Sequence, residues 1–281
     1  MKKMFLILLF ASQVFAQSSL LTLFDDASYD VDAKLYFTVA TSLSPAQKIR
    51  VNTFVKMLKD SLSITSLSSK FDVIYLMANE DSVSSKLNLV KRSDDGVKFN
   101  TLSFTQWEGW TGDVAGNFAY MNTTYNPSTE ATNYAQNSNA FGVYVRNNLN
   151  VNVACGNTLP NNYIYPRLSD KFYFTNNVTA AGNQSITNTD SRGFFISSRT
   201  AAAVTNGYKN GVSLAENTTV SAAPASANFY IFARNNGAAA EGYSQFQISF
   251  FFIGGGLTAI QARQLNNCVE WYMDDLGKGV E

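Results

Sequence analysis

Six residues between positions 107 and 134 have the side chains best suited to bind a ligand. They are aromatic or amide residues: Trp107, Trp110, Tyr120, Tyr125, Asn126 and Tyr134. Sugars present apolar ring faces bounded by hydroxyls, so aromatic rings beside amide groups suit them physically. The sequence therefore predicts a glycan-binding surface in this stretch. In the alternative interpretation, the two tryptophans pack in the core or at an edge of the fold.

A calcium site is a weaker candidate in the same stretch. Asp113, Asn117 and Asn122 could supply oxygen ligands from adjoining loops, and calcium binds carboxylate, amide and carbonyl oxygens. The regular acidic loop of EF-hand proteins is absent. We therefore expect no metal and no cofactor, with calcium at these three residues as the alternative.

The chain has two cysteines, Cys155 and Cys268. In an oxidising compartment they could form one long-range disulfide, which would restrict the unfolded chain. Alternatively, they are two buried thiols that behave as small apolar side chains. The sequence leaves both possibilities open.

Composition excludes several kinds of chemistry. Histidine is absent, which rules out Ser/His/Asp and Cys/His relays. Only seven acids lie between Thr101 and Phe250, scattered singly, so no carboxylate pair of the kind a glycosidase needs is apparent. We therefore expect a protein that is not an enzyme. Because 21 Lys and Arg balance 21 Asp and Glu, we also expect no nucleic-acid partner.

The first sixteen residues have the pattern of a secretory signal peptide. Lys2 and Lys3 precede an apolar run from Met4 to Phe10, and Ala16 ends the segment. The alternative is an N-terminal arm that is retained in an assembly. No apolar run is long enough for a transmembrane anchor. We expect residues 17–281 to form a single exported domain, located outside the cell or in a virion.

Two helices and many short strands should position these residues. Capping signals at Ser44–Gln47 and Thr258–Gln261 begin apolar patterns of helical spacing, which predict helices over about 45–60 and 259–276. Turn signals and short extended runs fill much of the remainder. The predicted strands are Lys34–Ala40, Phe71–Met77, Lys86–Val90, Asn100–Gln106, Asn117–Met121, Gly142–Arg146, Val151–Ala154, Asn162–Tyr165, Lys171–Thr175, Gly193–Ser197, Asn228–Ala233 and Gln245–Ile253. This pattern predicts an all-β sandwich or jelly roll.

Several stretches resemble a group of tailed-phage structural and tail-appendage proteins. They are Phe54–Lys59, Phe71–Tyr75, Lys86–Val90, Gly109–Gly112, Asn122–Thr123, Tyr125–Ser128 and Gly256–Gly277. The resemblance implies a concanavalin-A-like, laminin-G-like jelly roll with flanking helices, and a virion role in assembly or host attachment. Expected partners are other virion subunits or further copies of the chain, and host-surface glycans. The N-terminal signal departs from the phage pattern, and the alternative is a secreted, lectin-like bacterial carbohydrate-binding protein.

Overall fold

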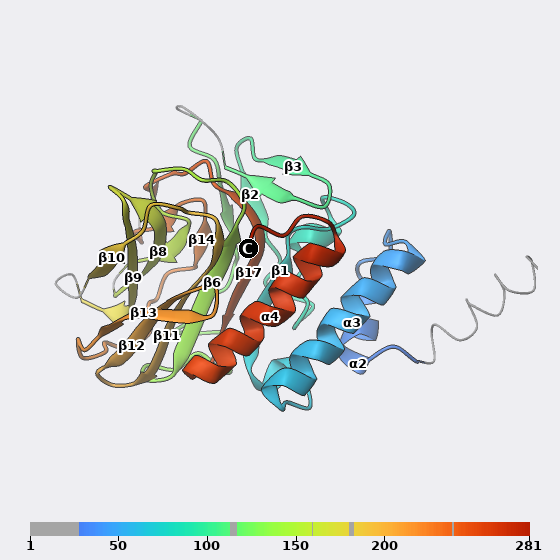
Figure 1. Cartoon of the computed structure of the whole chain (residues 1–281), viewed down its shortest axis with the longest axis horizontal. Coiled ribbons are helices and arrows are strands. Elements are labelled where there is room, and N and C mark those ends of the chain that lie inside the picture. The colour runs from blue at the N-terminus through green and yellow to red at the C-terminus, as the bar shows by residue number, and fades with distance from the viewer. Residues whose placement is uncertain (1–27, 113–116, 159, 180–182, 238) are drawn as a thin grey trace, which may run out of the picture.

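The protein is built in three layers (Figure 1). The computed structural model describes residues 28–112, 117–158, 160–179, 183–237 and 239–281. The predicted signal peptide and Asp113 lie outside these ranges. Helices form one outer layer, an eight-stranded sheet (sheet A) lies in the middle, and a nine-stranded sheet (sheet B) forms the other side. Almost all strand pairs are antiparallel, and the predicted jelly-roll sandwich with flanking helices is confirmed.

The helices are α2 (Val31–Phe37), α3 (Pro45–Leu62) and α4 (Ala259–Asp275). The predicted capping box of α4 is complete, because Thr258 and Gln261 bond to each other's backbone amide. The predicted strand Lys34–Ala40 is wrong, since most of it belongs to α2, which Asp30 caps through the backbone amide of Asp32. Within the described ranges, no helix is long and apolar enough to cross a membrane.

Sheet A contains the longest buried strands. Its order is β13 (Val212–Asn217), β12 (Val204–Lys209), β11 (Gly193–Ala201), β6 (Asn139–Val145), β17 (Gln247–Gly254), β4 (Gly109–Thr111) and β3 (Ser103–Thr105), with β1 (Phe71–Leu76) paired to β17. Both faces of its central strands are covered, which explains the continuous apolar run in β17.

Sheet B has one face in the sandwich core and one face outside. Its order is β10 (Gln184–Thr187), β9 (Lys171–Val178), β8 (Asn161–Leu168), β7 (Cys155–Asn157), β14 (Tyr230–Ile231), β5 (Tyr120–Asn122) and β2 (Val97–Phe99). A small hairpin of β15 (Arg234–Asn235) and β16 (Ala240–Glu241) joins β7. Two 3-10 turns, Leu67–Ser69 and Ser84–Lys86, flank β1. The predicted strand Lys86–Val90 is wrong, because Lys86 ends the second turn and residues 87–90 form bends and loop.

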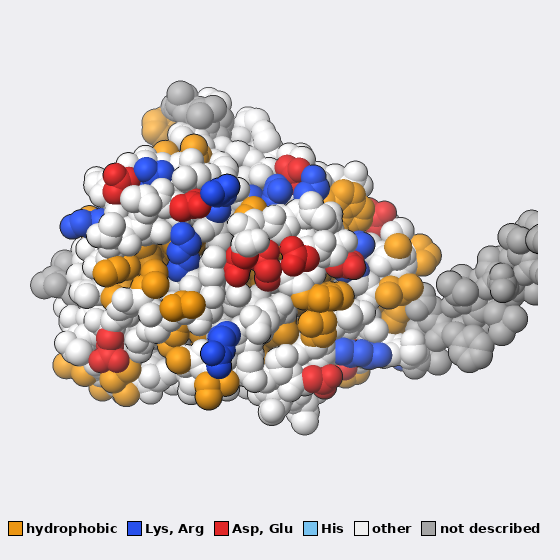
Figure 2. Space-filling model, in the orientation of Figure 1, with side chains coloured by type: hydrophobic (Ala, Val, Ile, Leu, Met, Phe, Trp, Pro, Cys, Tyr) orange, Lys and Arg blue, Asp and Glu red, His pale blue; other side chains and the backbone are white. Residues whose placement is uncertain are grey.

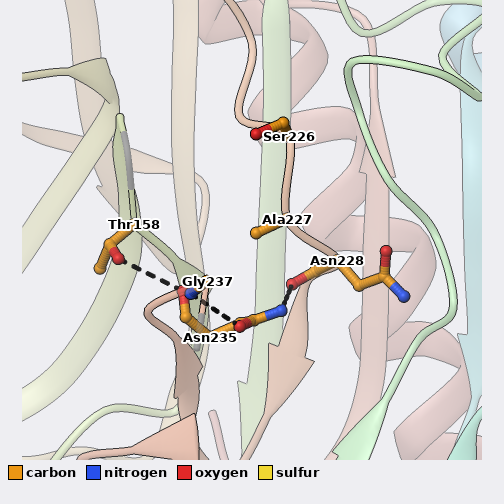
Figure 3. A pocket seen from close by; sticks show the side chains of 6 residues that line it. All are labelled: Thr158, Ser226, Ala227, Asn228, Asn235 and Gly237. Atoms are coloured by element: carbon orange, nitrogen blue, oxygen red, sulfur yellow. Dashed lines mark hydrogen bonds between the residues drawn. The ribbon is translucent and has the colours of Figure 1, made fainter. Parts of the chain in front are cut away.

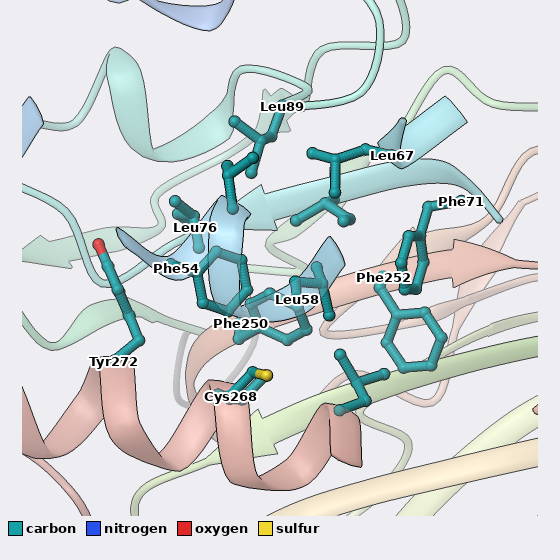
Figure 4. Close-up of a cluster of buried hydrophobic side chains, with 14 of the residues drawn as sticks. Phe54, Leu58, Leu67, Phe71, Leu76, Leu89, Phe250, Phe252, Cys268 and Tyr272 are labelled. Atoms are coloured by element: carbon teal, nitrogen blue, oxygen red, sulfur yellow. The ribbon is translucent and has the colours of Figure 1, made fainter. Parts of the chain in front are cut away.

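The helices pack on the outer face of sheet A (Figure 4). Phe54 of α3 makes edge-to-face contacts with Phe250 of β17, at 5.9 Å between ring centroids, and with Tyr272 of α4, at 5.5 Å. Phe251 and Ile253 point the other way, into the core between the two sheets. Each large side chain of this kind contributes about 1.5–3 kcal/mol when fully buried. The helices therefore cover the central strands of sheet A on this face.

The two cysteines are not bridged. Both are buried free thiols. Cys155 lies on β7 in the core between the sheets. Cys268 lies on α4 in the other core, between the helices and sheet A, beside Ser61. Sheet A separates the two cores, so the alternative of a Cys155–Cys268 disulfide is wrong. Burial raises the pKa of both thiols, which makes them poor nucleophiles.

Candidate functional site

Three of the six predicted ligand-binding residues are buried. Trp110, Tyr125 and Tyr134 expose 3% of their surface or less. The indole nitrogen of Trp110 donates to the hydroxyl of Ser85 at 2.8 Å inside the core. The prediction that these rings form a sugar platform is therefore wrong, because burial leaves them no free ring face.

Tyr125 and Tyr134 belong to a structural network centred on Asp72. The carboxylate of Asp72 is fully buried and accepts hydrogen bonds from five groups. They are the backbone amides of Thr132, Asn133 and Tyr134, the side-chain amide of Asn133 and the hydroxyl of Tyr125. None of these donors is a cation. Asp72 lies on β1 and thus holds the loop that follows β5 against this strand.

The other predicted residues are dispersed. Trp107 lies in the turn between β3 and β4 with its ring 5.8 Å from the guanidinium of Arg50 on α3, on the helical side of the molecule. Asn126 donates to the carbonyl of Ser226 at 3.0 Å. Tyr120 is the one aromatic residue of the six that lies half-buried on the outer face of sheet B. The six residues therefore do not form one surface.

The calcium alternative is likewise not supported by the described residues. The side-chain oxygen of Asn122 accepts from the amide of Thr124 at 2.8 Å and from Asn228 at 3.2 Å. The carbonyl of Asn117 accepts from Asn100. No group of three or more Cys, Asp or Glu residues is placed to hold a metal ion in the part of the chain that the structure describes.

A different set of aromatic residues forms an exposed surface. Phe99 of β2, Tyr120 of β5 and Tyr230 of β14 stack in a row on the outer face of sheet B, and we call these three rings the aromatic ladder. The centroids of Phe99 and Tyr120 are 4.7 Å apart with planes 2° apart, and those of Tyr120 and Tyr230 are 4.5 Å apart. Alternation in the strands positions the rings outside, because Met121 and Ile231 point into the core.

The ladder ends at an edge of the sheet. β2 is the last strand of sheet B on that side, and Phe99 is 40% exposed. Among the described residues, Tyr120 is the only ring that stacks on Phe99, and the exposed part of Phe99 remains accessible to a ligand. At the other side of Tyr120, Tyr243 contacts Phe118, which is 59% exposed. The result is a contiguous apolar surface on a face with no helical cover.

Amide groups border the ladder. Asn122 lies two residues after Tyr120 on β5, Asn228 lies two residues before Tyr230 in the segment that leads into β14, and Asn228 donates to Asn122 at 3.2 Å. Asn228 also lines a pocket of about 340 Å³ with Thr158, Ser226, Ala227, Asn235 and Gly237 (Figure 3). The aromatic ladder and this pocket therefore meet at Asn228.

One wall of the pocket is held by asparagine side chains. Three successive backbone carbonyls, those of Ser226, Ala227 and Asn228, each accept a hydrogen bond from a side-chain amide. The donors are Asn126 at 3.0 Å, Asn157 at 2.7 Å and Asn235 at 3.1 Å. Thr158 closes the opposite side through its backbone amide, which donates to the carbonyl of Asn235 at 2.8 Å. The wall is thus fixed before any ligand arrives, which lowers the entropic cost of binding.

The electrostatic character of this face is neutral. Arg234 of the β15–β16 hairpin is paired with Glu241 at 2.8 Å and lies over the ring of Tyr163. Burial and the neighbouring hydroxyl of Tyr230 raise the pKa of Tyr120 to about 12, so its hydroxyl remains protonated at neutral pH. On the helical side, Figure 2 shows Lys and Arg scattered among Asp and Glu rather than gathered into one basic field. A nucleic-acid interface would need such a field.

Sequence reasoning missed four aromatic members of this surface. Tyr120 was identified, but Phe99, Phe118, Tyr230 and Tyr243 were not. The available signal is local: Asn228–Ile231 and Tyr120–Asn122 each place outward residues on either side of an inward apolar one. Nothing in the sequence shows that these two segments, over a hundred positions apart, are neighbouring strands.

Comparisons with known proteins show the fold. No protein-family model matches the chain, and no curated protein matches it. The binding domain of botulinum neurotoxin DC, solved in complex with rat synaptotagmin II, superposes with a TM-score of 0.53 at 11% identity over 73% of this chain. A mutant Trypanosoma rangeli sialidase displaying trans-sialidase activity gives 0.50 at 13% identity over 82% of this chain. The shared feature is a β-sandwich.

The matched structures are mostly longer than this chain. The match spans 53% of the neurotoxin binding domain and 39% of the sialidase. Domain 4 of AbnA, a GH43 extracellular arabinanase from Geobacillus stearothermophilus in complex with arabinotriose, is covered to 98%, at 14% identity, over 70% of this chain, with a TM-score of 0.45. At these identities the likeness concerns architecture.

Proposed function

We propose that this protein is an exported, non-enzymatic glycan-binding protein that acts in attachment at the surface of a cell or particle. The observation that carries the proposal is the aromatic ladder, which ends at the exposed residue Phe99 and is bordered by the amides of Asn122 and Asn228. Ring faces bind the C–H faces of sugars, and amides bind their hydroxyls.

Two observations support binding without catalysis. The described lining of the pocket beside the ladder contains no carboxylate. Glu108, an acid within the stretch predicted to bind ligand, lies 2.6 Å from Lys278 and 3.1 Å from Arg146. The hydrogen bond from Lys278 is the main cause that lowers the pKa of Glu108, so this carboxyl stays ionised and is unsuited to act as a general acid.

Support of a coarser kind comes from the structural likenesses. The neurotoxin domain is a binding domain and the sialidase acts on a sugar, and both share the sandwich with this chain. Recognition of a partner by an exposed sandwich face is consistent with a role in attachment.

Replacing Phe99 with Ala should weaken glycan binding by about two- to thirteen-fold, because loss of one aromatic contact costs about 0.5–1.5 kcal/mol and 1.4 kcal/mol is a factor of ten in Kd. A glycan array would first identify a bound glycan, and isothermal titration calorimetry would then compare the wild type with Phe99→Ala and Tyr230→Ala. The same glycan, incubated with the protein, should release no reducing ends.

Tyr173→Ala is the matched control. Tyr173 lies on the same outer face, on β9, beyond the β15–β16 hairpin and away from the ladder. We expect this variant to bind like the wild type. The proposal would be contradicted if Tyr173→Ala lost as much glycan affinity as Phe99→Ala and Tyr230→Ala. It would also be contradicted if the protein bound a protein ligand such as synaptotagmin and no glycan.

A second candidate role is self-assembly through α2, as expected for an appendage subunit. Val31, Leu35 and Val39 are spaced four residues apart and are 58%, 42% and 38% exposed. Ile49 of α3 is also exposed. An apolar stripe of this kind suits contact with a second copy of the chain.

Leu35→Glu should shift the protein from oligomer to monomer, because a charge in an apolar contact is costly to desolvate. Native mass spectrometry and light scattering over a range of concentrations would measure this. Val220→Glu, at a 68% exposed site outside the stripe, is the control. A wild type that remains monomeric at all concentrations would remove this candidate.

A further inference from the structure

We infer that the aromatic ladder is one end of an extended track that binds an internal stretch of an uncharged polysaccharide, several sugar units long. This inference rests on the proposed glycan-binding function. It adds the class of ligand and the mode of binding, namely along the chain rather than at a single terminal sugar.

The first step is continuity. The pocket beside the ladder shares Ser226 with a second pocket, of about 440 Å³. The described residues that line this second pocket are Pro160, Asn161, Thr179, Ala222, Ala223, Pro224 and Ser226. Ser226 is exposed at the junction. The ladder meets the first pocket at Asn228, and the first pocket meets the second at Ser226, so the three form one track.

The second step is length. An extended chain rises about 3.3 Å per residue, so the segment from Tyr230 to Ser226 spans up to about 13 Å. The second pocket extends the track further, to Ala222 and Pro160. A single pyranose ring is shorter than the first of these spans. The track therefore fits a chain of linked sugars better than one residue.

The third step is chemical character. The two pockets have no charged side chain among their described lining residues. Recognition of a carboxylated, sialylated or sulfated sugar would use Arg or Lys. Arg234, the arginine of the β15–β16 hairpin, is already paired with Glu241. Amides and hydroxyls line the first pocket, and the proline and alanine side chains of the second offer apolar surface to ring faces. This combination selects neutral sugars.

The fourth step is rigidity. The wall shared by the two pockets is the segment whose carbonyls are held by Asn126, Asn157 and Asn235. Because the wall is already ordered, the binding of each further sugar unit carries no entropic cost of ordering the wall. Affinity should therefore rise with each unit that reaches along the track.

The test uses the full chain and calorimetry with oligosaccharides of one to six units from cellulose, chitin, xylan, arabinan and starch. Sialyllactose and oligogalacturonate serve as charged probes. In at least one neutral series, the Kd should fall ten-fold or more between two and five units. The charged probes should not bind more tightly than neutral chains of the same length.

Ala223→Trp distinguishes the track from the ladder alone. Ala223 is exposed, so the indole should block the second pocket without disturbing the core. We expect Ala223→Trp to abolish the gain from longer chains while short chains bind as before, and Ala223→Ser to behave like the wild type. Phe99→Ala should weaken chains of every length. Thermal unfolding would confirm that each variant is folded.

The outcomes separate the two proposals. A glycan that binds with the same affinity at every length, or an Ala223→Trp variant that binds long chains normally, overturns the track but leaves glycan binding intact. If a charged probe binds more tightly than a neutral chain of the same length, the inference that the track selects uncharged sugars is overturned. If no glycan in the array or the oligosaccharide panel binds, the proposed function fails and the track fails with it.

Discussion

Replacing Asp72 with Ala should lower the free energy of unfolding by about 2–6 kcal/mol, because the two fully buried donors to this carboxylate would each lose a hydrogen-bond partner at about 1–3 kcal/mol. Five donors converge on this carboxylate, and three of them are consecutive backbone amides. A methyl group accepts no hydrogen bond, so the hydroxyl of Tyr125 and the backbone amide of Tyr134 would be left buried without a partner. Urea denaturation followed by tryptophan fluorescence would measure the change.

Asp275→Ala is the matched control for Asp72. The Asp275 carboxylate is half-exposed at the end of α4 and pairs with Arg50 at the surface, where an ion pair contributes about 0–1 kcal/mol. An Asp72 variant no less stable than this control would show that the loop after β5 is held by other contacts. Asp72→Asn should fall between the two, because its amide retains one acceptor oxygen.

Replacing Arg199 with Met should cost about 3 kcal/mol or more, for a related reason. The guanidinium is fully buried and donates to four backbone carbonyls, with no carboxylate among its partners. These carbonyls belong to Asn176, Ala201, Ala202 and Thr219. Met fills similar volume but leaves the carbonyls without their donors. Arg199 thereby joins β9 to the segments around the β11–β12 turn and beyond β13.

The stability measurement for Arg199 has its own controls. Arg199→Lys should recover only part of the loss, since an ammonium has three donors and lacks the planar geometry of guanidinium. Arg192→Met removes an arginine that pairs with Asp190 at the surface and should change stability little. If Arg199→Met and Arg192→Met unfold alike, the buried guanidinium is not a stabilising element.

The sequence was informative about the helices that cover the fold. The signals at Ser44 and Thr258 correctly predict α3 and α4, because caps and apolar spacing are local properties. The strand predicted over Lys34–Ala40 failed because short apolar runs fit either structure, and contacts with α3 decide in favour of a helix. Asn206–Gly207 is a residue pair typical of tight turns, but it lies inside β12, where the Phe174 ring leaves no room for a side chain beyond glycine.

The candidate site was harder to predict for a physical reason. Trp110, Tyr125 and Tyr134 have the residue types of a sugar platform, yet their polar groups are satisfied inside the core. The ladder is assembled from β2, β5 and β14, so its existence depends on strand order rather than on any contiguous motif. Only Tyr120 is common to the predicted and the observed sets. Residue type indicates what a side chain can bind, whereas the pairing of the strands decides on which face of a sheet the side chain lies.

The uneven cover of the two sheets gives the molecule a front and a back. Since α4 lies on the back and both native thiols are buried, a cysteine introduced at the exposed position Asn267 would be the one readily labelled thiol in the described chain. Biotin attached there would orient every molecule on a sensor with its ladder toward the solution. Many copies held in this way would present parallel sites to a polymer, and weak single contacts would add up to tight capture.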